Sequence, residues 1–399
     1  MELYNHQKEI LSKNPAKHLV CWDTGVGKTL AGILWGNQYK DVLVICPKHL
    51  KKQWGRAIKE NGKTSFLVVS KEEFRRDWDD LPKCDAIIGD EAHYFAGMKS
   101  QLSKRLLQYI KKHEVKFVWL LTATPYMSTP WNIYRLAQVL GYRWNYWEFS
   151  NRFFYHVQMG SRMIPQVRPN IEEDIADLVN KIGTTLSIYD CFDVPKQTFL
   201  EPEFFALTKE QEKALKTLKE NETNPAVRYG RMHQVENGAL KGDDFTPHAF
   251  FEAEKHARLH ELADENKKIA IFCRYTLQLE LLKKEFEAEG KKVFLINGDE
   301  KDKDAVALEA EASDECVCLI NAACSEGYEL PSIGFIVFAS FSFSYKDYKQ
   351  AIGRFLRGNK LKKNVYLPLV NEGTIDHAVY QSILNKQDFD IAIYARNQK

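Results

Sequence analysis

Short runs of apolar residues alternate with helix-length segments along the first third of the chain. Five such runs lie at 18–22, 41–46, 65–70, 85–90 and 116–121. Each run is apolar throughout and does not alternate with polar positions, so we expect both of its faces to be buried, as in a parallel sheet with helices on both sides. The pattern therefore predicts a parallel α/β domain over residues 1–145.

The same alternation returns in the last third of the chain. Its apolar runs lie at 268–273, 292–297, 316–321, 335–340 and 365–370, and a helical pattern covers 276–289. A second sheet of the same class, over residues 251–399, is the economical interpretation. Between the two, residues 146–250 hold aromatic and proline-rich stretches and a strongly helical run at 207–221, so we expect a connector with a helical insertion there.

The composition limits the class of protein. A chain of 399 residues with 44% hydrophobic residues can bury two sizeable cores. The net charge is only +2, so any attraction to polyanions has to come from local clusters of basic residues. The chain begins without an apolar signal core and has no apolar stretch long enough to span a membrane, and its eight cysteines form no C-x-x-C pair. We expect reduced thiols and a cytoplasmic protein of a bacterium or of a virus in its host.

A glycine-rich turn follows the first apolar run. The segment TGVGKT, residues 24–29, stands directly after this predicted strand and directly before a helical run. Such a turn points backbone N–H groups at an anion, Lys28 can reach the outer phosphates, and Thr29 can bind magnesium. The full phosphate-loop pattern has glycine where this chain has Trp22, and an ordinary glycine-rich turn is the alternative. The candidate nucleotide-binding residues here are Thr24, Gly25, Val26, Gly27, Lys28, Thr29 and Leu30.

Two adjacent acids follow another strand of the same predicted sheet. Asp90 and Glu91 come after the run AIIG, at the carboxyl edge where ligands bind in open α/β sheets. Asp90 can hold magnesium and Glu91 can orient and deprotonate the attacking water. A solvated acidic loop is the alternative for this segment alone. Thr122 and Thr124 close a further strand, and their hydroxyls could relay the state of the phosphate site.

The segment QAIGRFLR in the second half places two arginines three residues apart. Arg354 and Arg357 therefore project from one face of a helix. Two guanidinium groups that face a triphosphate from the opposite domain would stabilise transition-state charge as arginine fingers. Arginines on a solvated helix are the alternative. We include Gln350, which begins the segment, among the catalytic candidates.

Taken together, these segments resemble the motifs of superfamily-two helicases. GVGKT, DEAH, TATP and QAIGRFLR are similar, in this order, to motifs I, II, III and VI. YNHQ at 4–7 resembles the segment that reads adenine, 42–54 resembles motif Ia, 271–276 motif IV and 321–331 motif V. Segments that resemble these motifs therefore occur in both halves of the chain.

Within that superfamily the chain resembles the Swi/Snf-type ATPases, the DNA translocases of chromatin remodellers and their bacterial and viral relatives. The stretches CPKHLKKQWGRAIKE, SKEEFRRDWDDL and NEGTIDHAVYQSIL carry this likeness. The resemblance implies two RecA-like domains that use ATP and Mg²⁺. It assigns adenine recognition to Gln7, coupling to Thr122 and Thr124, and interdomain or ribose contacts to Gly327 and Glu329. The segment around Glu329 reads SEGYELP, which has less glycine than the Swi/Snf-type pattern.

Two basic clusters predict a track for nucleic acid. Residues 48–76 hold nine Lys or Arg against three Glu, and residues 350–363 hold five basic residues and no acid. Clusters of this kind suit contact with a phosphate backbone, although each cluster alone also fits a solvated helix face. The named candidates are Lys48, Lys51, Arg75 and Arg76. Aromatic residues near 144–154 could stack on bases, or could pack between domains.

The function we expect is that of a monomeric ATP-driven translocase on nucleic acid, with double-stranded or branched DNA as its track. ATP turnover would drive remodelling or branch migration. A helicase that separates strands of DNA or RNA is the alternative within this class. A nucleotide-switched DNA-binding scaffold with little turnover is the alternative from another class.

Overall fold

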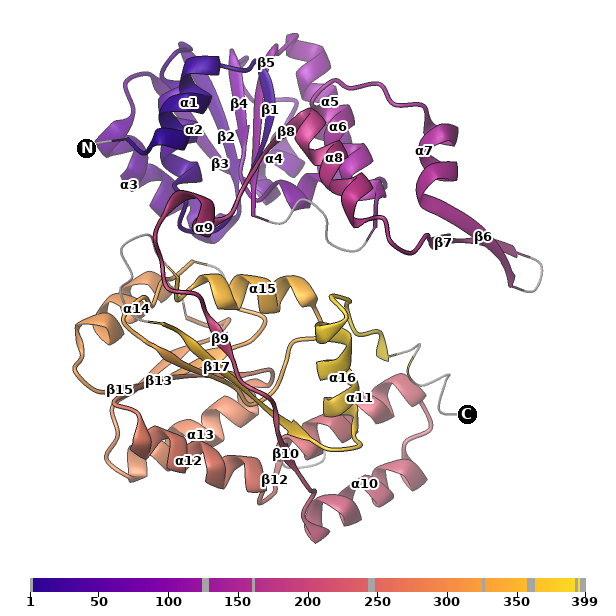
Figure 1. The fold of residues 1–399 in the computed structure, drawn as a ribbon, viewed down its shortest axis with the longest axis vertical. Helices are drawn as coiled ribbons and strands as arrows, with labels where there is room; N and C mark the ends of the chain where they lie inside the picture. Colours follow the sequence, from indigo (N-terminus) through magenta and orange to yellow (C-terminus); the bar gives the residue numbers. More distant parts are fainter. Residues whose placement is uncertain are drawn as a thin grey trace. The chain divides into compact units, whose positions relative to one another are not determined.

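The chain forms two compact units, Met1–Asp193 and Val194–Lys399 (Figure 1). The computed structural model describes residues 3–123, 129–159, 162–242, 248–300, 302–324, 327–356, 363–391 and 394. The segment 146–250, which we expected to be a connector, is divided between the two units at Asp193. Thr124 and Arg357 lie outside the described residues.

The first unit holds the predicted amino-terminal sheet. Its elements in chain order are α1 (Asn5–Lys13), β1 (Lys17–Trp22), α2 (Lys28–Gly36), β2 (Asp41–Cys46), η1 (Lys48–Leu50), α3 (Lys51–Asn61), β3 (Ser65–Ser70), α4 (Lys71–Asp77), β4 (Ala86–Gly89), η2 (Ala92–Phe95), α5 (Gln101–His113), β5 (Phe117–Thr122), α6 (Trp131–Val139), α7 (Tyr146–Phe153), β6 (Phe154–Met159), β7 (Arg162–Val167), α8 (Glu172–Ile182), β8 (Gly183–Leu186) and α9 (Ile188–Cys191).

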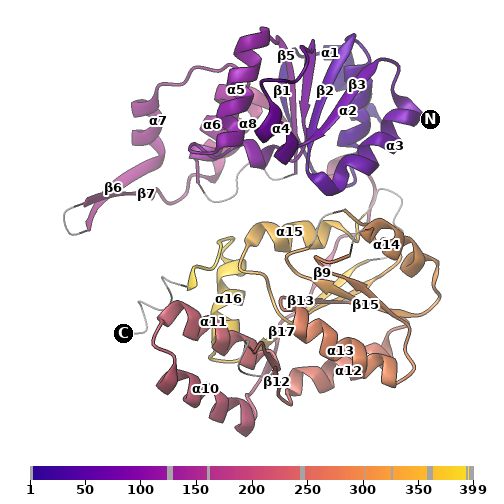
Figure 2. The same cartoon turned by 180° about the vertical axis from the view of Figure 1, so that it is seen from behind.

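This sheet has six parallel strands in the order β3-β2-β4-β5-β1-β8. Figures 1 and 2 show α1, α2 and α3 on one face and α4, α5, α6 and α8 on the other. Because both faces are covered, the central strand β4 has no exposed position, whereas Ser65 and Leu67 of the edge strand β3 are exposed. The five apolar runs predicted as strands match β1 to β5, and the parallel α/β fold is confirmed. The edge strand β8 was not predicted, because its sequence GTTL is short and polar.

A two-stranded antiparallel hairpin, β6–β7, extends away from this sheet (Figure 1). At its base, buried Phe154 is paired with half-buried Val167. Farther along, Tyr155, Val157 and Met163 are exposed. An isolated two-stranded hairpin is only marginally stable in water, so these exposed apolar side chains require an explanation.

The second unit holds the predicted carboxyl-terminal sheet. Its elements are β9 (Thr198–Phe199), β10 (Glu203–Phe205), α10 (Lys209–Asn221), α11 (Pro225–Glu236), β11 (Ala239–Leu240), β12 (Ala249–Phe250), α12 (Glu254–Glu265), β13 (Lys268–Cys273), α13 (Thr276–Ala288), β14 (Val293–Ile296), α14 (Lys303–Ala312), β15 (Cys316–Asn321), β16 (Phe335–Phe338), α15 (Tyr345–Gly353), β17 (Val365–Asn371) and α16 (Ile375–Leu384).

The second sheet is also parallel, in the order β10-β17-β16-β13-β15-β14, and β9 pairs with β17. Alternate residues of the central strand β13 enter different cores. Ile269 and Ile271 pack with α12 and α13, whereas Ala270 and Phe272 pack in the core that includes α14 and α16. This alternation explains why β13 is apolar at every position but its first. The two α/β units with parallel sheets are RecA-like domains.

No helix in the part of the chain that the structure describes has the length and apolar character needed to cross a membrane.

Candidate functional site

The glycine-rich turn occupies the junction between β1 and α2 in a backbone conformation that only glycine adopts easily. Gly25 has a φ of 81° and Gly27 has a φ of 86°. A Cβ atom added to Gly27 would stand 2.5 Å from Nε2 of Gln7. The turn therefore depends on glycine at position 27 for two independent reasons, its φ angle and its close approach to α1.

Helix α1 fixes Gln7 against this turn. The side chain of Gln7 is fully buried, and its Nε2 donates to the carbonyl of Gly27 at 3.2 Å. Its Oε1 accepts from the backbone N–H of Tyr4 at 3.1 Å. Nearby, Nε2 of His6 lies 3.0 Å from the carbonyl oxygen of Val26. The structure thus brings together two segments that are twenty residues apart in the sequence.

Lys28 begins α2 and its ammonium group lies over the turn. Nζ donates to the carbonyls of Trp22 at 2.8 Å and Asp23 at 3.0 Å. Burial lowers the pKa of Lys28, and the negative charges of Glu91 and Asp90 oppose that effect. The lysine and the two acids therefore lie near enough to interact electrostatically. Val26 is buried, whereas Thr24, Thr29 and Leu30 are half-buried and Gly25 is exposed.

Strand order explains how residues from three segments reach one edge. In the sheet β5 lies between β4 and β1. Asp90 follows β4, Thr122 ends β5, and the glycine-rich turn follows β1. Thr122 is fully buried and is paired in register with Cys21. The carboxyl ends of parallel strands meet at one edge, so all three segments share the place where ligands bind in such sheets.

Asp90 is held by two hydrogen bonds. Its Oδ2 accepts from the indole N–H of Trp54 at 2.7 Å, and its Oδ1 accepts from the backbone N–H of Glu91 at 2.9 Å. Burial, and then the charge of Glu91, raise the pKa of Asp90 to about 6, while the Trp54 bond acts against this shift. Trp54 lies in the segment that resembles motif Ia, but no pattern in that segment indicates a role for this residue. Only the fold shows that α3 places this buried indole on the carboxylate.

Glu91 has a left-handed backbone, with φ 50° and ψ 59°, which is uncommon for a residue other than glycine. Its Oε2 lies 3.1 Å from Nδ1 of His93, whose side chain is buried. The 3₁₀ helix η2 that starts after Glu91 places His93 there. His93 is the second residue of this site whose position sequence analysis did not predict.

The oxygen groups at this edge suit a magnesium ion. Hard cations such as Mg²⁺ prefer carboxylate and hydroxyl oxygens, which Asp90 and Thr29 supply. Asp90 is a buried carboxyl next to a second acid, so a cation would favour its ionised form. Bound magnesium would neutralise charge on the outer phosphates of a nucleotide. The described residues contain no group of three or more His, Cys, Asp or Glu that could hold a metal by itself.

In the second unit, the segment that resembles motif VI contacts the one that resembles motif V. Nη1 of Arg354 donates to the carbonyl of Tyr328 at 3.3 Å, and the backbone N–H of Leu330 donates to the carbonyl of Arg354 at 3.0 Å. Gly327, with a φ of 87°, precedes this contact. Gln350 and Arg354 are both buried, with 4% and 9% of their surface exposed, and Glu329 is exposed. Within the described residues, Nε of Arg354 is buried without an acceptor, which leaves donor capacity for an anion.

The four basic candidates for nucleic-acid contact differ in their surroundings. Lys51 forms an ion pair with Glu73 at 2.6 Å, and Arg76 forms one with Asp77 at 2.7 Å. Lys48 and Arg75 are exposed. The Lys51 bond and the backbone N–H of Ser70 lower the pKa of Glu73 to about 2. Two of the four cations therefore already have a carboxylate partner.

The aromatic residues near 144–154 pack inside the first unit. Trp131 of α6 stacks on Tyr146 at 4.9 Å and on Phe154 at 5.0 Å, and Trp144 stacks on Phe149 at 5.8 Å. Trp147 is an exception because 72% of its surface is exposed. Most of this aromatic density is therefore core packing of α6 and α7.

Comparison with known proteins matches residues 254–359 to the helicase conserved C-terminal domain. The SWI/SNF-related matrix-associated actin-dependent regulator of chromatin subfamily A-like protein 1 of Drosophila melanogaster is 23% identical over 429 residues, which cover 95% of this chain. The alignment covers 54% of that protein, so the chain spans about half the length of this relative.

Two solved structures are similar to the whole chain. The helicase domain of Pyrococcus furiosus Hef has a TM-score of 0.54 at 16% identity, over 95% of this chain and 98% of that one. The Sulfolobus solfataricus SWI2/SNF2 ATPase core in complex with double-stranded DNA has a TM-score of 0.42 at 18% identity, over 96% and 91%. The Hef likeness shows that both units have the fold of a helicase core. The helicase C-terminal domain and the Drosophila relative support the resemblance of this chain to superfamily-two helicases of the Swi/Snf type.

Proposed function

We propose that this chain is a motor that hydrolyses ATP and translocates along double-stranded DNA. One observation carries the proposal: the glycine-rich turn with Lys28, and the acids Asp90 and Glu91, share the carboxyl edge of the first sheet. This edge combines a glycine turn for phosphates, a carboxylate for magnesium and a carboxylate for a water molecule. A nucleotide switch that does not turn over would not need the last of these.

Each residue has a separate task in this proposal. The turn from Thr24 to Gly27 and the first residues of α2 bind the phosphates, and the buried amide of Gln7 holds Gly27 in place. Asp90 and Thr29 would hold the magnesium ion. Glu91 accepts a proton from the attacking water, and the buried ring of His93 lies beside its carboxylate.

The second unit contributes positive charge and a response to the nucleotide. In this proposal Arg354 and Arg357 stabilise charge on the phosphates during hydrolysis, and Gly327 and Glu329 contact the ribose. Thr122 and Thr124 couple the presence of the outer phosphate to the affinity of the protein for nucleic acid. Repeated binding and hydrolysis change how the two units hold the backbone, and the motor advances.

Two observations favour duplex DNA as the nucleic acid along which the motor moves. The Drosophila relative is named as a regulator of chromatin, in which the nucleic acid is duplex DNA. Exposed Lys48 and Arg75 lie in the basic cluster of residues 48–76 and can contact backbone phosphates. Contacts of this kind are indifferent to sequence, as a translocating motor requires.

The decisive test is phosphate release by Lys28→Ala and Glu91→Gln variants, with and without duplex DNA. We expect DNA-stimulated ATPase in the parent chain and its loss in both variants. Glu114→Gln is the matched control, because Glu114 has a φ of 52° like Glu91 but is exposed at the end of α5. Full activity of Glu91→Gln would overturn the site assignment. A parent chain that binds DNA without turnover would favour the scaffold alternative.

The strand-separating alternative is supported by the hairpin β6–β7. Exposed Tyr155, Val157 and Met163 are side chains of the kind that insert between base pairs. A triplex-displacement assay set against a fork-unwinding assay separates the two functions. Displacement without unwinding supports translocation on duplex DNA, whereas unwinding that is lost when Tyr155 and Val157 become serine supports the alternative.

A further inference from the structure

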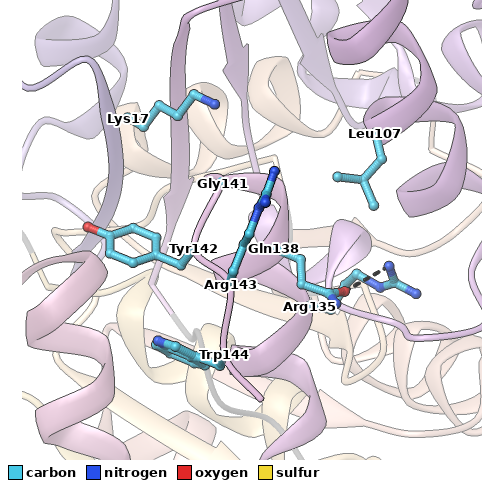
Figure 3. A pocket seen from close by; sticks show the side chains of 8 residues that line it. All are labelled: Lys17, Leu107, Arg135, Gln138, Gly141, Tyr142, Arg143 and Trp144. Atoms are coloured by element: carbon cyan, nitrogen blue, oxygen red, sulfur yellow. Dashed lines mark hydrogen bonds between the residues drawn. The ribbon is translucent and has the colours of Figure 1, made fainter. Parts of the chain in front are cut away.

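A hollow of about 590 Å³ lies beside the first residue of β1 (Figure 3). Lys17, Arg135 and Arg143 line it together with Tyr142 and Trp144, and no acidic residue does. The glycine-rich turn follows the last residue of β1, so the hollow lies at the opposite edge of the first sheet from the nucleotide site. None of the motif residues lines it, and the proposed hydrolysis makes no use of it.

The three cations around the hollow have no acidic partners. Among the described residues, none of Lys17, Arg135 and Arg143 forms an ion pair with a carboxylate. Like charges that face one hollow repel each other, and an anion that binds there relieves this repulsion. The hollow is therefore built for a negatively charged ligand.

Arg135 is the most constrained of these cations. Its Nη1 donates to Oε1 of Gln138 at 3.0 Å, and its Nη2 donates to the carbonyl of Met98. Nε is buried without an acceptor in the described part of the chain, and burial lowers the pKa of this guanidinium. Gly141 leaves space for the second cation, because a Cβ there would lie 3.1 Å from Nζ of Lys17.

Trp144 adds a fixed aromatic plane to the hollow. One face of its ring stacks on Phe149 with an interplanar angle of 10°. Its carbonyl accepts from the hydroxyl of Tyr134 at 3.1 Å, and the neighbouring Tyr142 donates its own hydroxyl to the carbonyl of Lys181 at 3.0 Å. An aromatic plane beside several cations suits a nucleotide base and its phosphates. The bases of a duplex are already stacked on each other, so an unpaired base fits this surface better.

After Glu148, which follows the hollow in the chain, comes a segment without acids. Residues 149–171, which include the hairpin β6–β7, contain no Asp or Glu, and they contain Arg152, Arg162 and Arg168. Arg152 is paired with Asp174 and Arg168 donates to the carbonyl of Asn151. Between Glu148 and Glu172 the chain therefore adds basic residues and no negative charge.

We propose that this hollow binds an unpaired strand of nucleic acid, with its phosphates on the three cations and a base on Trp144. The inference rests on the proposed motor function and narrows its substrate class to duplex DNA with a single-stranded extension or branch. A free nucleotide presents the same base and phosphate, and the experiment below distinguishes the two sources.

The test compares binding of a blunt duplex with binding of the same duplex carrying a single-stranded tail, by fluorescence anisotropy over a series of salt concentrations. We expect the parent chain to bind the tailed duplex tighter by on the order of tenfold, since a stacked base alone contributes this much. The double variant Lys17→Gln, Arg143→Gln should lose most of this preference. For the tailed duplex, the slope of the logarithm of the binding constant against the logarithm of the salt concentration should become shallower by about 0.7 for each removed cation.

The control removes the same charge elsewhere. Lys40→Gln, Lys116→Gln replaces two exposed lysines of the same unit that do not line the hollow, and it should keep the tail preference. If the double variant does not fold, Arg143→Gln alone tests the same point, because its side chain is exposed. DNA-stimulated ATPase on the blunt duplex should be equal in all these proteins.

Two results would overturn the inference. The first is a parent chain that binds the tailed duplex no more tightly than the blunt duplex. This result would overturn the inference even if the hollow binds AMP, because it would then be a site for a free nucleotide. The second is a double variant whose tail preference and salt dependence equal those of the control. Both can occur while DNA-stimulated ATPase is normal, so they are distinct from failure of the proposed motor, which would show as absence of that ATPase in the parent chain.

Discussion

The hydrogen bond between Trp54 and Asp90 makes a sharp prediction about the nucleotide site. Trp54 is 1% exposed, and its indole N–H donates to the Oδ2 atom of Asp90 at 2.7 Å. The variant Trp54→Phe keeps an aromatic ring in the core and removes this donor. The carboxylate then loses one of its two hydrogen bonds and is free to rotate away from the position in which it would hold magnesium.

The size of the effect follows from the charge and burial of the pair. A hydrogen bond to an ionised group contributes about 1.5–3 kcal/mol, and leaving a buried acceptor unsatisfied costs a similar amount. If the whole of this energy is lost from the transition state, kcat falls by about 10- to 100-fold. The fold itself should survive, since the ring still fills most of the space.

Trp35 provides a matched control for this experiment. Trp35 is also fully buried, but in the described part of the chain its indole N–H has no acceptor. Trp35→Phe therefore removes the same atoms from a core without removing a bond to the site. DNA-stimulated ATPase and thermal unfolding should be measured for both variants. If Trp54→Phe keeps an activity within about twofold of Trp35→Phe, the assigned role of this bond in catalysis is wrong.

Two further predictions concern backbone and charge. Gly27→Ala should abolish nucleotide binding measured by calorimetry, because it strains a φ of 86° and meets Gln7, whereas Gly55→Ala, with no atom within 4 Å of the added Cβ, should not. Burial, and then the charge of Asp376, raise the pKa of Glu236 to about 8. The folded state therefore holds a proton that the unfolded state releases, and the free energy of unfolding should fall as pH rises toward 8, by at most about 1.4 kcal/mol per pH unit. As the pH rises toward 8, Glu236→Gln should become more stable relative to the parent chain in denaturant titrations. A difference in the free energy of unfolding that does not change with pH would contradict the assignment.

The second core contains a buried network of charge that no sequence pattern indicated. Nζ of Lys255 donates to Oδ2 of Asp376 at 2.7 Å, and the same carboxyl lies 3.2 Å from Nε2 of His233. All three side chains are at most 1% exposed. Lys255 belongs to α12, Asp376 to α16 and His233 to α11, and more than a hundred residues of sequence separate Asp376 from the other two. Separate helix patterns carry no information about which polar positions will meet in the interior.

The sequence by itself determined the strands and turns that can be recognised from a few neighbouring residues. Apolar runs predicted five strands in each half because a strand covered on both faces must be apolar at nearly every position. The glycine turn and the acids could be placed at strand ends because a strand, a turn and a helix follow each other directly in the chain. The polar edge strand β8 was not predicted, since pairing with β1 alone makes it a strand.

Only the tertiary structure decided which strand ends are neighbours and which side chains meet there. The order β4-β5-β1 brings Asp90 toward Lys28, and α3 brings Trp54 to the same carboxylate across thirty-six positions. The hollow beside Lys17 likewise joins the start of β1 to residues of α6 and the turn that follows it. Such contacts depend on how whole elements pack. A pattern within one segment reports the environment of that segment, and it does not report the identity of its partner.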